Sequence, residues 1–469
     1  MAALQKIVDT VNTYLSDYIL LILLVGMGIF FSIRTKFVQV RCFGEGMKAV
    51  FGSDSRKKGN GINKFQALAT AIAAQVGTGN IVGACGAILI GGPGAIFWMW
   101  VIAFFGMSTI YAEAILAQKT KTVDADGTVH GGPVYYIKTA FKGNFGKFLA
   151  GFFAVAATLA LGFMGAMVQS NSIGSTMEAA FKIPSWVIGL AVAAIVGVIL
   201  LGGVKRIASV SEKLVPVMAI LYLIGGLVVI CINITGVPAA FGLIFKYAFT
   251  PAAALGGGFG AIFTAMTQGA KRGLFSNEAG MGSTPHAHAL ANVKNPHEQG
   301  VAAMMGVFID TFIVLTMTAL VVITVLYTRD GALADFVATG DLTMGGAILN
   351  KETMAQEAFA QSFGSASFGN IFVAICLFFF AFSTIISWNY FGKVNVEYLF
   401  GKKAIPVYTV LALVFIVLGS FLQNDLVWAL MDLFNQLMVL PNAIALFALS
   451  GMVVMANKNK NKNDLGLGK

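Results

Sequence analysis

The sequence predicts an all-α polytopic membrane protein with eleven transmembrane helices, and three observations lead to this fold class. Of the 469 residues, 57% are hydrophobic and 11% are charged, whereas about 25% are charged in an ordinary soluble domain. Apolar stretches recur from Tyr14 to Met455, and each is long enough to cross roughly 30 Å of hydrocarbon as a helix. Lys and Arg gather in alternate segments between these stretches. A soluble enzyme with one core is therefore excluded.

The predicted spans lie where apolar runs are bounded by charged residues or by Gly and Pro. No A-x-A cleavage site accompanies the first run, so we expect a retained helix rather than a signal peptide. The four cysteines have no disulfide or metal-motif spacing and are expected to be packing residues. In chain order the spans cover residues 15–33, 62–89, 93–117, 148–171, 185–203, 211–232, 256–290, 298–327, 368–393, 404–421 and 427–455.

The loop charges predict an orientation, because Lys and Arg stay on the cytoplasmic side of a membrane. The segments after spans 1, 3, 5, 7, 9 and 11, with the span ends beside them, hold 24 of the 31 Lys and Arg; the N-terminus and the other segments hold 5. A miscounted span would move every later loop to the wrong side. We therefore predict an N-terminus outside and a C-terminus inside. The positive surplus forms no single stripe, so nucleic acid is not an expected partner.

Removing the first span leaves ten, which divide into two fives that begin on opposite sides, as in an inverted repeat. This division predicts four segments. Residues 1–60 form an extra N-terminal transmembrane helix and a cytoplasmic linker, 61–235 the first repeat, 236–456 the second repeat, and 457–469 a basic cytoplasmic tail.

The second and seventh spans, which hold the same place in the two halves, are both interrupted by glycines and polar residues. The interruptions are Gln75–Asn80 and Gly273–Ser283. Glycine frees backbone N–H and C=O groups, which hydrocarbon tolerates only where they line a cavity or bind something. The matched pair indicates a transporter site; chance glycines and a helix contact through Gly79 and Gly83 are the alternatives. A dinucleotide loop is excluded, because Phe97–Trp100 follows instead of a βαβ unit with its acidic residue.

Two such breaks suit a zwitterion. The N–H groups at the start of a half-helix attract a carboxylate, which we expect near Thr78 and Gly79. Free carbonyls and side-chain oxygens near Phe275, Ser276 and Asn277 suit an ammonium group, and Na⁺ takes carbonyl or hydroxyl oxygens. No full charge then remains unpaired in the membrane.

The ninth span carries two adjacent hydroxyls, Ser383 and Thr384, in an apolar helix. They either offer oxygens to a ligand or bond carbonyls of their own or a neighbouring helix. Trp388 either closes a pocket or belongs to the cytoplasmic aromatic belt, since Lys393 lies nearby. The residues alone favour carbonyl bonds for the two hydroxyls and the aromatic belt for Trp388.

Ionisable residues inside or beside spans are functional candidates by default, because charge is costly in hydrocarbon. Gate residues, proton carriers and structural pairs all remain open, and Lys271 or Arg272 is a candidate partner of Glu278. The full set is Glu113, Lys271, Arg272, Glu278, Asp310 and Asp432.

Other polar motifs indicate no enzyme and no structural metal. His286 and His288 are two residues apart and do not share a helix face, so we expect no chelation there. Asp124–Gly127 lacks the remaining ligands of a calcium loop and is expected to be a turn. The chain contains neither H-E-x-x-H nor a nucleophile with a base, so an intramembrane enzyme is not expected.

Two long motifs resemble a known family. The sixteen residues Gly91–Gly106, GGPGAIFWMWVIAFFG, resemble the signature of the sodium:alanine symporter family, the alanine or glycine:cation symporters. Gly273–Ser283, GLFSNEAGMGS, is similar to that family's second hallmark, and the span pattern agrees over nearly the whole chain. The resemblance implies a leucine-transporter-type fold of five plus five helices after one extra helix.

The same resemblance implies roles for individual residues. The carbonyls of Ala73 and Val76 with the hydroxyls of Ser383 and Thr384 are expected to bind sodium. Met164 and Gln169 are further expected pocket walls, and Gln75 takes the place of a small residue. In the expected substrate site Thr78, Gly79 and Asn80 meet the carboxylate or a second ion, Phe275, Ser276, Asn277 and Gly280 face the amino group and side chain, and Gln75 and Trp388 complete the wall.

The function implied is a plasma-membrane symporter that imports alanine or glycine with Na⁺ by alternating access, with no organic cofactor. Trp388 would leave room for a methyl group or a hydrogen and disfavour larger side chains by overpacking. The alternatives are a proton-coupled or uncoupled transporter of the same fold, for which Glu278 and Asp310 are the candidates, and a channel. The lipid bilayer and the amino acid are the expected partners.

Overall fold

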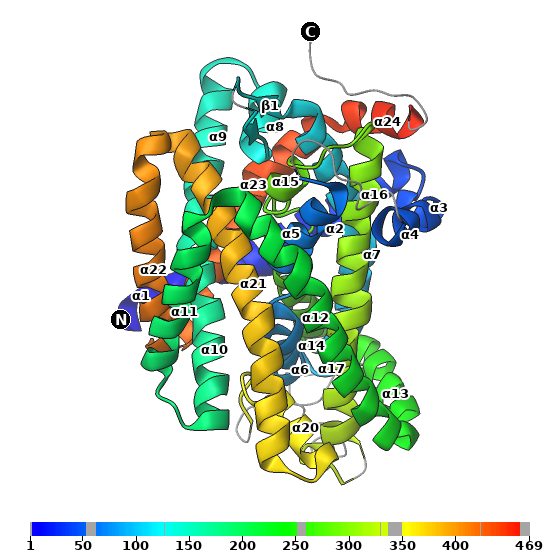
Figure 1. The fold of residues 1–469 in the computed structure, drawn as a ribbon. Helices are drawn as coiled ribbons and strands as arrows, with labels where there is room; N and C mark the ends of the chain where they lie inside the picture. The colour runs from blue at the N-terminus through cyan, green and yellow to red at the C-terminus, as the bar shows by residue number, and fades with distance from the viewer. Residues whose placement is uncertain are drawn as a thin grey trace.

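The structure is a computed structural model that describes residues 2–52, 62–125, 127–250, 259–328, 330–335, 349–422 and 424–459. In this part of the chain, long helices pack side by side into one bundle (Figure 1). Strands β1 (Thr122–Val123) and β2 (Val129–His130) pair antiparallel and form the one sheet of the described residues. The predicted helical class is thus confirmed.

Eight helical segments among the described residues are long and apolar enough to cross a membrane, and they correspond to predicted spans 1, 3, 4, 6, 8, 9, 10 and 11. A helix suits this setting because it satisfies its own backbone hydrogen bonds. Their elements are α1 (Ala2–Tyr14), η1 (Leu15–Leu20) and α2 (Leu21–Arg34); α7 (Gly94–Thr120); α9 (Gly143–Ala157), η4 (Thr158–Gly165) and α10 (Ala166–Phe181); α12 (Gly203–Ile232); α16 (Pro296–Val307), η7 (Phe308–Leu315), α17 (Thr316–Val322) and η8 (Ile323–Tyr327); α21 (Ala366–Phe400); η10 (Lys402–Ala404) and α22 (Ile405–Phe421); and α23 (Asn424–Ala448).

The second predicted span is a broken helix. It consists of α5 (Lys64–Gln75), the π-helical turn η3 (Gly79–Gly83) and α6 (Ala84–Gly91), and the two parts are bent by 46° at the break. The seventh is also broken: α14 (Phe259–Asn277) ends in a non-helical segment before the short α15 (Pro285–His288). The fifth is α11 (Ser185–Leu201), an apolar helix of 17 residues.

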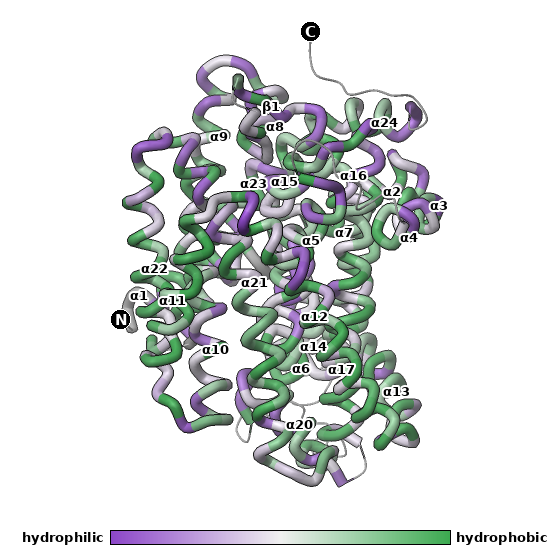
Figure 2. The backbone as a smooth tube through the Cα atoms, in the orientation of Figure 1, coloured by the Kyte–Doolittle hydropathy of each residue, from purple (hydrophilic) through white to green (hydrophobic). Residues whose placement is uncertain are grey.

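The two ends of the bundle carry different loops (Figure 1). The hairpin, α15, α8 (Pro133–Ala140), α24 (Ser450–Lys458) and the short helices α3 (Val38–Arg41) and α4 (Phe43–Phe51) lie at one end. At the other lie η5 (Ile234–Gly236), α13 (Val237–Phe249) and α20 (Met354–Phe363). Hydrophilic segments gather at the first end, whereas the outer helices between the ends are largely hydrophobic (Figure 2). The loops after predicted spans 1 and 3 and the segments at the ends of predicted spans 7 and 11 thus share one end.

Several boundaries differ from the prediction. The last span was predicted to reach residue 455, but α23 ends at Ala448 and the chain turns into α24, whose last turn carries Lys458. The loop helices α13 and α20 were not predicted. The Asp124–Gly127 turn is confirmed, since Gly127 N donates to Asp124 O at 2.9 Å and closes the hairpin. The predicted start of the seventh span at residue 256 lies outside the described residues.

Candidate functional site

The first break follows Gln75. Val76 adopts an extended conformation (φ −80°, ψ 90°), which ends α5 and frees the carbonyls of its last turn. The Gln75 Nε2 atom donates to Asn277 O at 2.8 Å, so the end of α5 is joined directly to the end of α14. Gly77 N donates to Asn80 Oδ1 at 2.9 Å and Thr78 N donates to Gln169 Oε1 at 3.1 Å. These bonds hold the non-helical backbone in place, and the side chain of Gln169 lies at the break.

The two hydroxyls of α21 meet the freed carbonyls of α5. Thr384 Oγ1 lies 3.0 Å from Ala73 O, 3.3 Å from Ala74 O and 3.5 Å from Val76 O, and Ser383 Oγ lies 3.3 Å from Ala73 O. Thr384 Oγ1 also lies 3.1 Å from Phe380 O of its own helix. The alternatives of a cross-helix contact and a bond to the hydroxyl's own helix therefore coexist, and the four expected sodium ligands converge on one place.

The second break contains three residues with positive φ. They are Glu278 (58°), Gly280 (87°) and Gly282 (81°). This region is strained for any residue with a Cβ atom, so the glycines are required by the backbone and Glu278 is an exception. Glu278 keeps its place through its side chain, which accepts hydrogen bonds from Trp388 Nε1 and Ser283 Oγ.

The candidate pairing of Glu278 with Lys271 or Arg272 is wrong for Arg272. Arg272 instead contacts Asp432 of α23, with Nη1 3.3 Å from Oδ1. Glu278 lies beyond the end of α14, where the backbone turns away, so its side chain meets α21 rather than the preceding helical turn. Arg272 lies six positions earlier, inside α14, where its side chain meets α23.

Asp310, in the π-helical segment η7, joins the two broken helices. Its carboxylate accepts from Asn80 Nδ2 at 2.6 Å, from Ser276 Oγ at 2.9 and 3.0 Å, and from Thr311 Oγ1 at 2.8 Å. Asn277 Nδ2 adds a contact of 3.3 Å to Thr311 Oγ1. Three of the expected substrate residues, from both halves of the chain, therefore surround this one segment. Asp310 was predicted only as an ionisable residue in a span.

A third buried carboxylate, Glu113 of α7, holds the backbone of the second break. It accepts from Gly280 N at 3.0 Å, Gly282 N at 2.9 Å and Asn442 Nδ2 at 2.7 Å. Asn442 in turn donates to Gly280 O at 2.9 Å and accepts from the Tyr136 hydroxyl. The N–H groups of Gly280 and Gly282 and the carbonyl of Gly280 are paired in this way, as a buried backbone requires.

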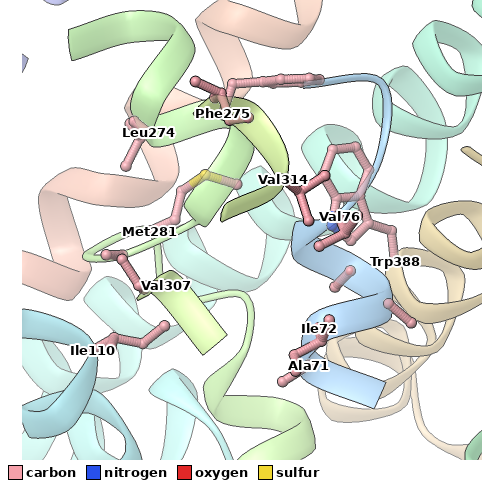
Figure 3. Packing of buried hydrophobic residues seen from close by; sticks show 14 of the residues in the cluster. Ala71, Ile72, Val76, Ile110, Leu274, Phe275, Met281, Val307, Val314 and Trp388 are labelled. Carbon is pink, nitrogen blue, oxygen red and sulfur yellow. The ribbon is translucent and has the colours of Figure 1, made fainter. Parts of the chain in front are cut away.

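Trp388 lies buried against the second break and not in an exposed aromatic belt. It is 1% exposed, its ring packs edge-on against Phe275 at 5.7 Å between centroids, and its N–H bonds Glu278. Gly165 of η4 lies directly under the indole, where an added Cβ would collide with the ring. Figure 3 shows Phe275, Val76 and Trp388 among the buried apolar side chains around the breaks. Met164, the other expected wall residue, lies next to Gly165 in η4 and is 9% exposed.

The two breaks approach each other at Gly79. A Cβ there would lie 2.9 Å from Ser276 Cα and 3.1 Å from Phe275 Cδ1, so only glycine permits this approach. The expected substrate residues with side chains are all buried, none more than 3% exposed: Gln75, Thr78, Asn80, Phe275, Ser276, Asn277 and Trp388. The region between the breaks is closed to solvent.

A layer of aromatic and charged residues covers the site on the α23 side. Trp428 packs on Phe275 at 4.9 Å, and the cations of Arg272 and Lys351 lie 4.8 and 5.0 Å from its ring. Such cation–π contacts favour the charged forms and fix the ring. Burial lowers the pKa of the Lys351 ammonium, and the positive charge of Arg272 lowers it further. The spacing Trp428–Asp432 on one helix face could have suggested this layer; its partners could not be read from the sequence.

A cavity of about 680 Å³ opens at the end of the bundle that carries the hairpin. Residues of α21 beyond Trp388, including Tyr390 and Lys393, line it together with Ile62 and Lys121. Burial lowers the pKa of Lys121 to about 8. None of the expected substrate residues lines this cavity, so the cavity and the site are separate in this conformation.

Comparisons with known proteins agree over the whole chain. The family model described as "sodium:alanine symporter family" matches residues 1–465. The sodium/alanine symporter AgcS of Methanococcus maripaludis is 40% identical over 461 residues, covering 97% of each chain. The probable sodium/glutamine symporter GlnT of Bacillus subtilis is 40% identical over 458 residues, covering 97% of this chain and 90% of that protein. An uncharacterized transporter of Haemophilus influenzae is 41% identical over 462 residues, or 97% and 96% of the two chains.

A solved structure shares the fold. The crystal structure of MhsT in complex with L-phenylalanine superposes with a TM-score of 0.57 at 12% identity, covering 85% of this chain and all of that one. At this identity the similarity concerns the fold, which is thus of the leucine-transporter type.

Proposed function

This chain is a member of the sodium:alanine symporter family of amino-acid:cation symporters, and from that premise we propose that it imports alanine or glycine together with Na⁺ across the plasma membrane. Alternating access would take place around the breaks in α5–α6 and α14–α15. The relative from M. maripaludis is named a sodium/alanine symporter, which supports the substrate. An equally similar relative is named a probable sodium/glutamine symporter, so the proposed substrate depends on the residues of this chain's own pocket.

The observation that carries the proposal is the convergence of two hydroxyls on the carbonyls released by the first break. Hard cations such as Na⁺ prefer oxygen ligands, and unwound helices of transporters supply them as carbonyls. Ala73 O lies 3.3 Å from Ser383 Oγ and 3.0 Å from Thr384 Oγ1, and Val76 O lies 3.5 Å from Thr384 Oγ1. We assign the sodium site to these four residues.

The amino acid is proposed to lie between the two breaks. Thr78 Oγ1 and Gln75 Oε1 are buried and have no hydrogen-bond partner among the described residues. Buried polar atoms are nearly always paired, so these two atoms suit a polar ligand. The carboxylate of the amino acid would bind Thr78 and the N–H groups that follow it, and its ammonium group would bind the oxygens around Ser276 and Asn277.

Selectivity for a small side chain rests on Trp388. Its ring is fixed by Phe275, Gly165 and the hydrogen bond to Glu278. A side chain larger than a methyl group would have to displace this ring, and overpacking of that kind costs about 1–3 kcal/mol. The separate cavity lined by Tyr390 and Lys393 lies farther along the same helix, and we propose it as the release path.

The test is uptake of radiolabelled alanine into proteoliposomes under an inward gradient of Na⁺, K⁺ or protons. We expect accumulation with Na⁺ alone. Thr384→Ala should raise the Na⁺ concentration needed for half-maximal uptake about tenfold or more, because a ligand to a charged group is lost. Thr176→Ala is the matched control, since this buried hydroxyl bonds Ser172 O in its own helix, away from the breaks.

Proton coupling is the second candidate, and buried carboxylates favour it. Glu278 and Asp310 are both fully buried, and no basic side chain of the described residues pairs with either. Such a carboxylate is stable when it is protonated or bound to a cation. Uptake driven equally well by protons without Na⁺ would overturn the sodium proposal and make Asp310→Asn the next variant to measure.

A further inference from the structure

Three side chains with metal-binding atoms meet far from the two breaks. The Sγ atom of Cys42, a carboxylate oxygen of Glu45 and an imidazole nitrogen of His297 all lie within 4.8 Å of one another. Cys42 is fully buried, His297 is 4% exposed and Glu45 is exposed. The group lies where α4 packs against α16, at the end of the bundle that carries the hairpin (Figure 1).

The local sequence explains why the three side chains meet. Cys42 is the residue before α4 and Glu45 lies in its first turn, three residues on, so both face the same side. His297 lies in the first turn of α16. Gly46 lets the helices approach closely: a Cβ there would lie 2.7 Å from Met305 Cγ and 3.1 Å from Val301 O of α16.

The donor set suits one class of ion. Thiolate, imidazole and carboxylate are the ligands that Zn²⁺ takes in proteins, with bonds of about 2.0–2.3 Å that place tetrahedral donors roughly 3.5 Å apart. His297 Nε2 already lies 3.0 Å from Glu45 Oε2. A side-chain shift of about 1 Å would therefore bring all three donor atoms to the spacing of a tetrahedral zinc site. Three protein ligands with one exposed member leave a fourth position for water, as in open zinc sites.

A fourth residue fixes the histidine ring. Tyr111 Oη lies 2.7 Å from His297 Nδ1 and directs Nε2 toward Glu45. Metal-bound histidines are commonly oriented by such a hydrogen bond to the other ring nitrogen. This contact comes from α7, so the ring is held from a different helix than the one that carries it.

We propose that Cys42, Glu45 and His297 bind a divalent ion of the Zn²⁺ class that joins α4 to α16. The ion would link the segment after the first span to the start of the eighth, the span that carries Asp310. The predicted cytoplasmic side suits the site, because thiols remain reduced there and available as thiolate ligands.

The test uses Co²⁺ as a spectroscopic probe on the full-length protein purified in detergent without chelator. A Cys-ligated Co²⁺ ion gives a thiolate-to-metal charge-transfer band in the near ultraviolet, and added Zn²⁺ removes it by competition. We expect the band in the wild type, its loss in Cys42→Ser, and at least about tenfold weaker binding in Glu45→Gln and His297→Gln. Tyr111→Phe should weaken binding about 10- to 100-fold as a positioning residue.

Two controls separate the site from other thiols and histidines. Cys231→Ser removes the exposed cysteine, and His130→Gln removes a histidine that pairs with Asp124 in the hairpin; both should keep the band. Glu45 is exposed, so Glu45→Gln keeps the test valid if Cys42→Ser fails to fold. A wild type without the band, a band that survives Cys42→Ser, or binding unchanged by Glu45→Gln and His297→Gln overturns the proposal and leaves an ordinary ion pair.

Discussion

Single residues in this site act through what they touch, and Gly165 illustrates this best. It lies beneath the Trp388 ring, so a methyl group there would push the indole toward Phe275. Overpacking of this size costs about 1–3 kcal/mol, or a 5- to 150-fold change in affinity. We therefore expect Gly165→Ala to raise the alanine concentration for half-maximal uptake within that range.

Uptake measured against alanine concentration checks this expectation. Gly151→Ala is the matched control, because a Cβ at that position meets no atom within 4 Å. Equal half-maximal concentrations for Gly165→Ala and Gly151→Ala would show that Trp388 does not bound the pocket.

The residue patterns predicted which residues lie at the breaks but not their partners; only the family resemblance paired Thr384 with the carbonyls of Ala73 and Val76. Glycines and hydroxyl-bearing residues within apolar spans can be recognised in the sequence, so Thr78, Ser276 and Thr384 could be singled out. Glu113 and Gly280 are 167 positions apart, and Asn80 and Asp310 are 230 apart. Only packing of whole helices brings such pairs together, and no local pattern encodes it.

At the scale of elements, the break in α14 depends on the carboxylate of α7. Glu113→Ala would leave Gly280 N, Gly282 N and the Asn442 amide without their acceptor. Each buried group left unpaired costs about 1–3 kcal/mol, so we expect a clear fall in unfolding temperature together with loss of uptake. Glu113→Gln keeps one acceptor oxygen, so its unfolding temperature and its uptake should fall less than those of Glu113→Ala.

Thermal unfolding in detergent, followed alongside uptake, measures this effect. Glu178→Ala is the control, because Glu178 is exposed near the end of α10 and its side chain accepts a hydrogen bond only from Ser185 among the described residues. An unfolding temperature that Glu113→Ala leaves at the wild-type value would show that the break does not need this carboxylate.

Element existence was predicted better than element ends. Long apolar runs specify helices directly, whereas α23 stops at Ala448 although the sequence remains apolar to Met455. Leu449 leaves the helical conformation and α24 begins in a new direction. Hydropathy indicates which residues are unfavourable in water, but it does not indicate where a helix bends. The proposed division into repeats at residues 235 and 236 falls between α12 and α13 and stays a prediction.

At the scale of the whole molecule, the loop charges predict which end faces the cytoplasm. Position 458 in α24 and position 234 beyond α12 lie at opposite ends of the bundle. In a Cys231→Ser background, Ile234→Cys should react with a membrane-impermeant maleimide in intact cells. Lys458→Cys should react only after permeabilisation, because positive loops remain inside. The reverse labelling pattern would show that the protein has the opposite orientation in the membrane.

The ring contacts of Phe275 with Trp388 and Trp428 also give the protein an intrinsic fluorescence signal near the site. Of its five tryptophans, these two are buried, and both contact Phe275 of the last turn of α14. Trp186 is 53% exposed, and Trp98 and Trp100 are half-buried on α7. Movement of α14 changes the surroundings of both buried indoles at once. The emission of the unlabelled protein should therefore register each step of the transport cycle, and stopped-flow mixing could time those steps without any attached dye.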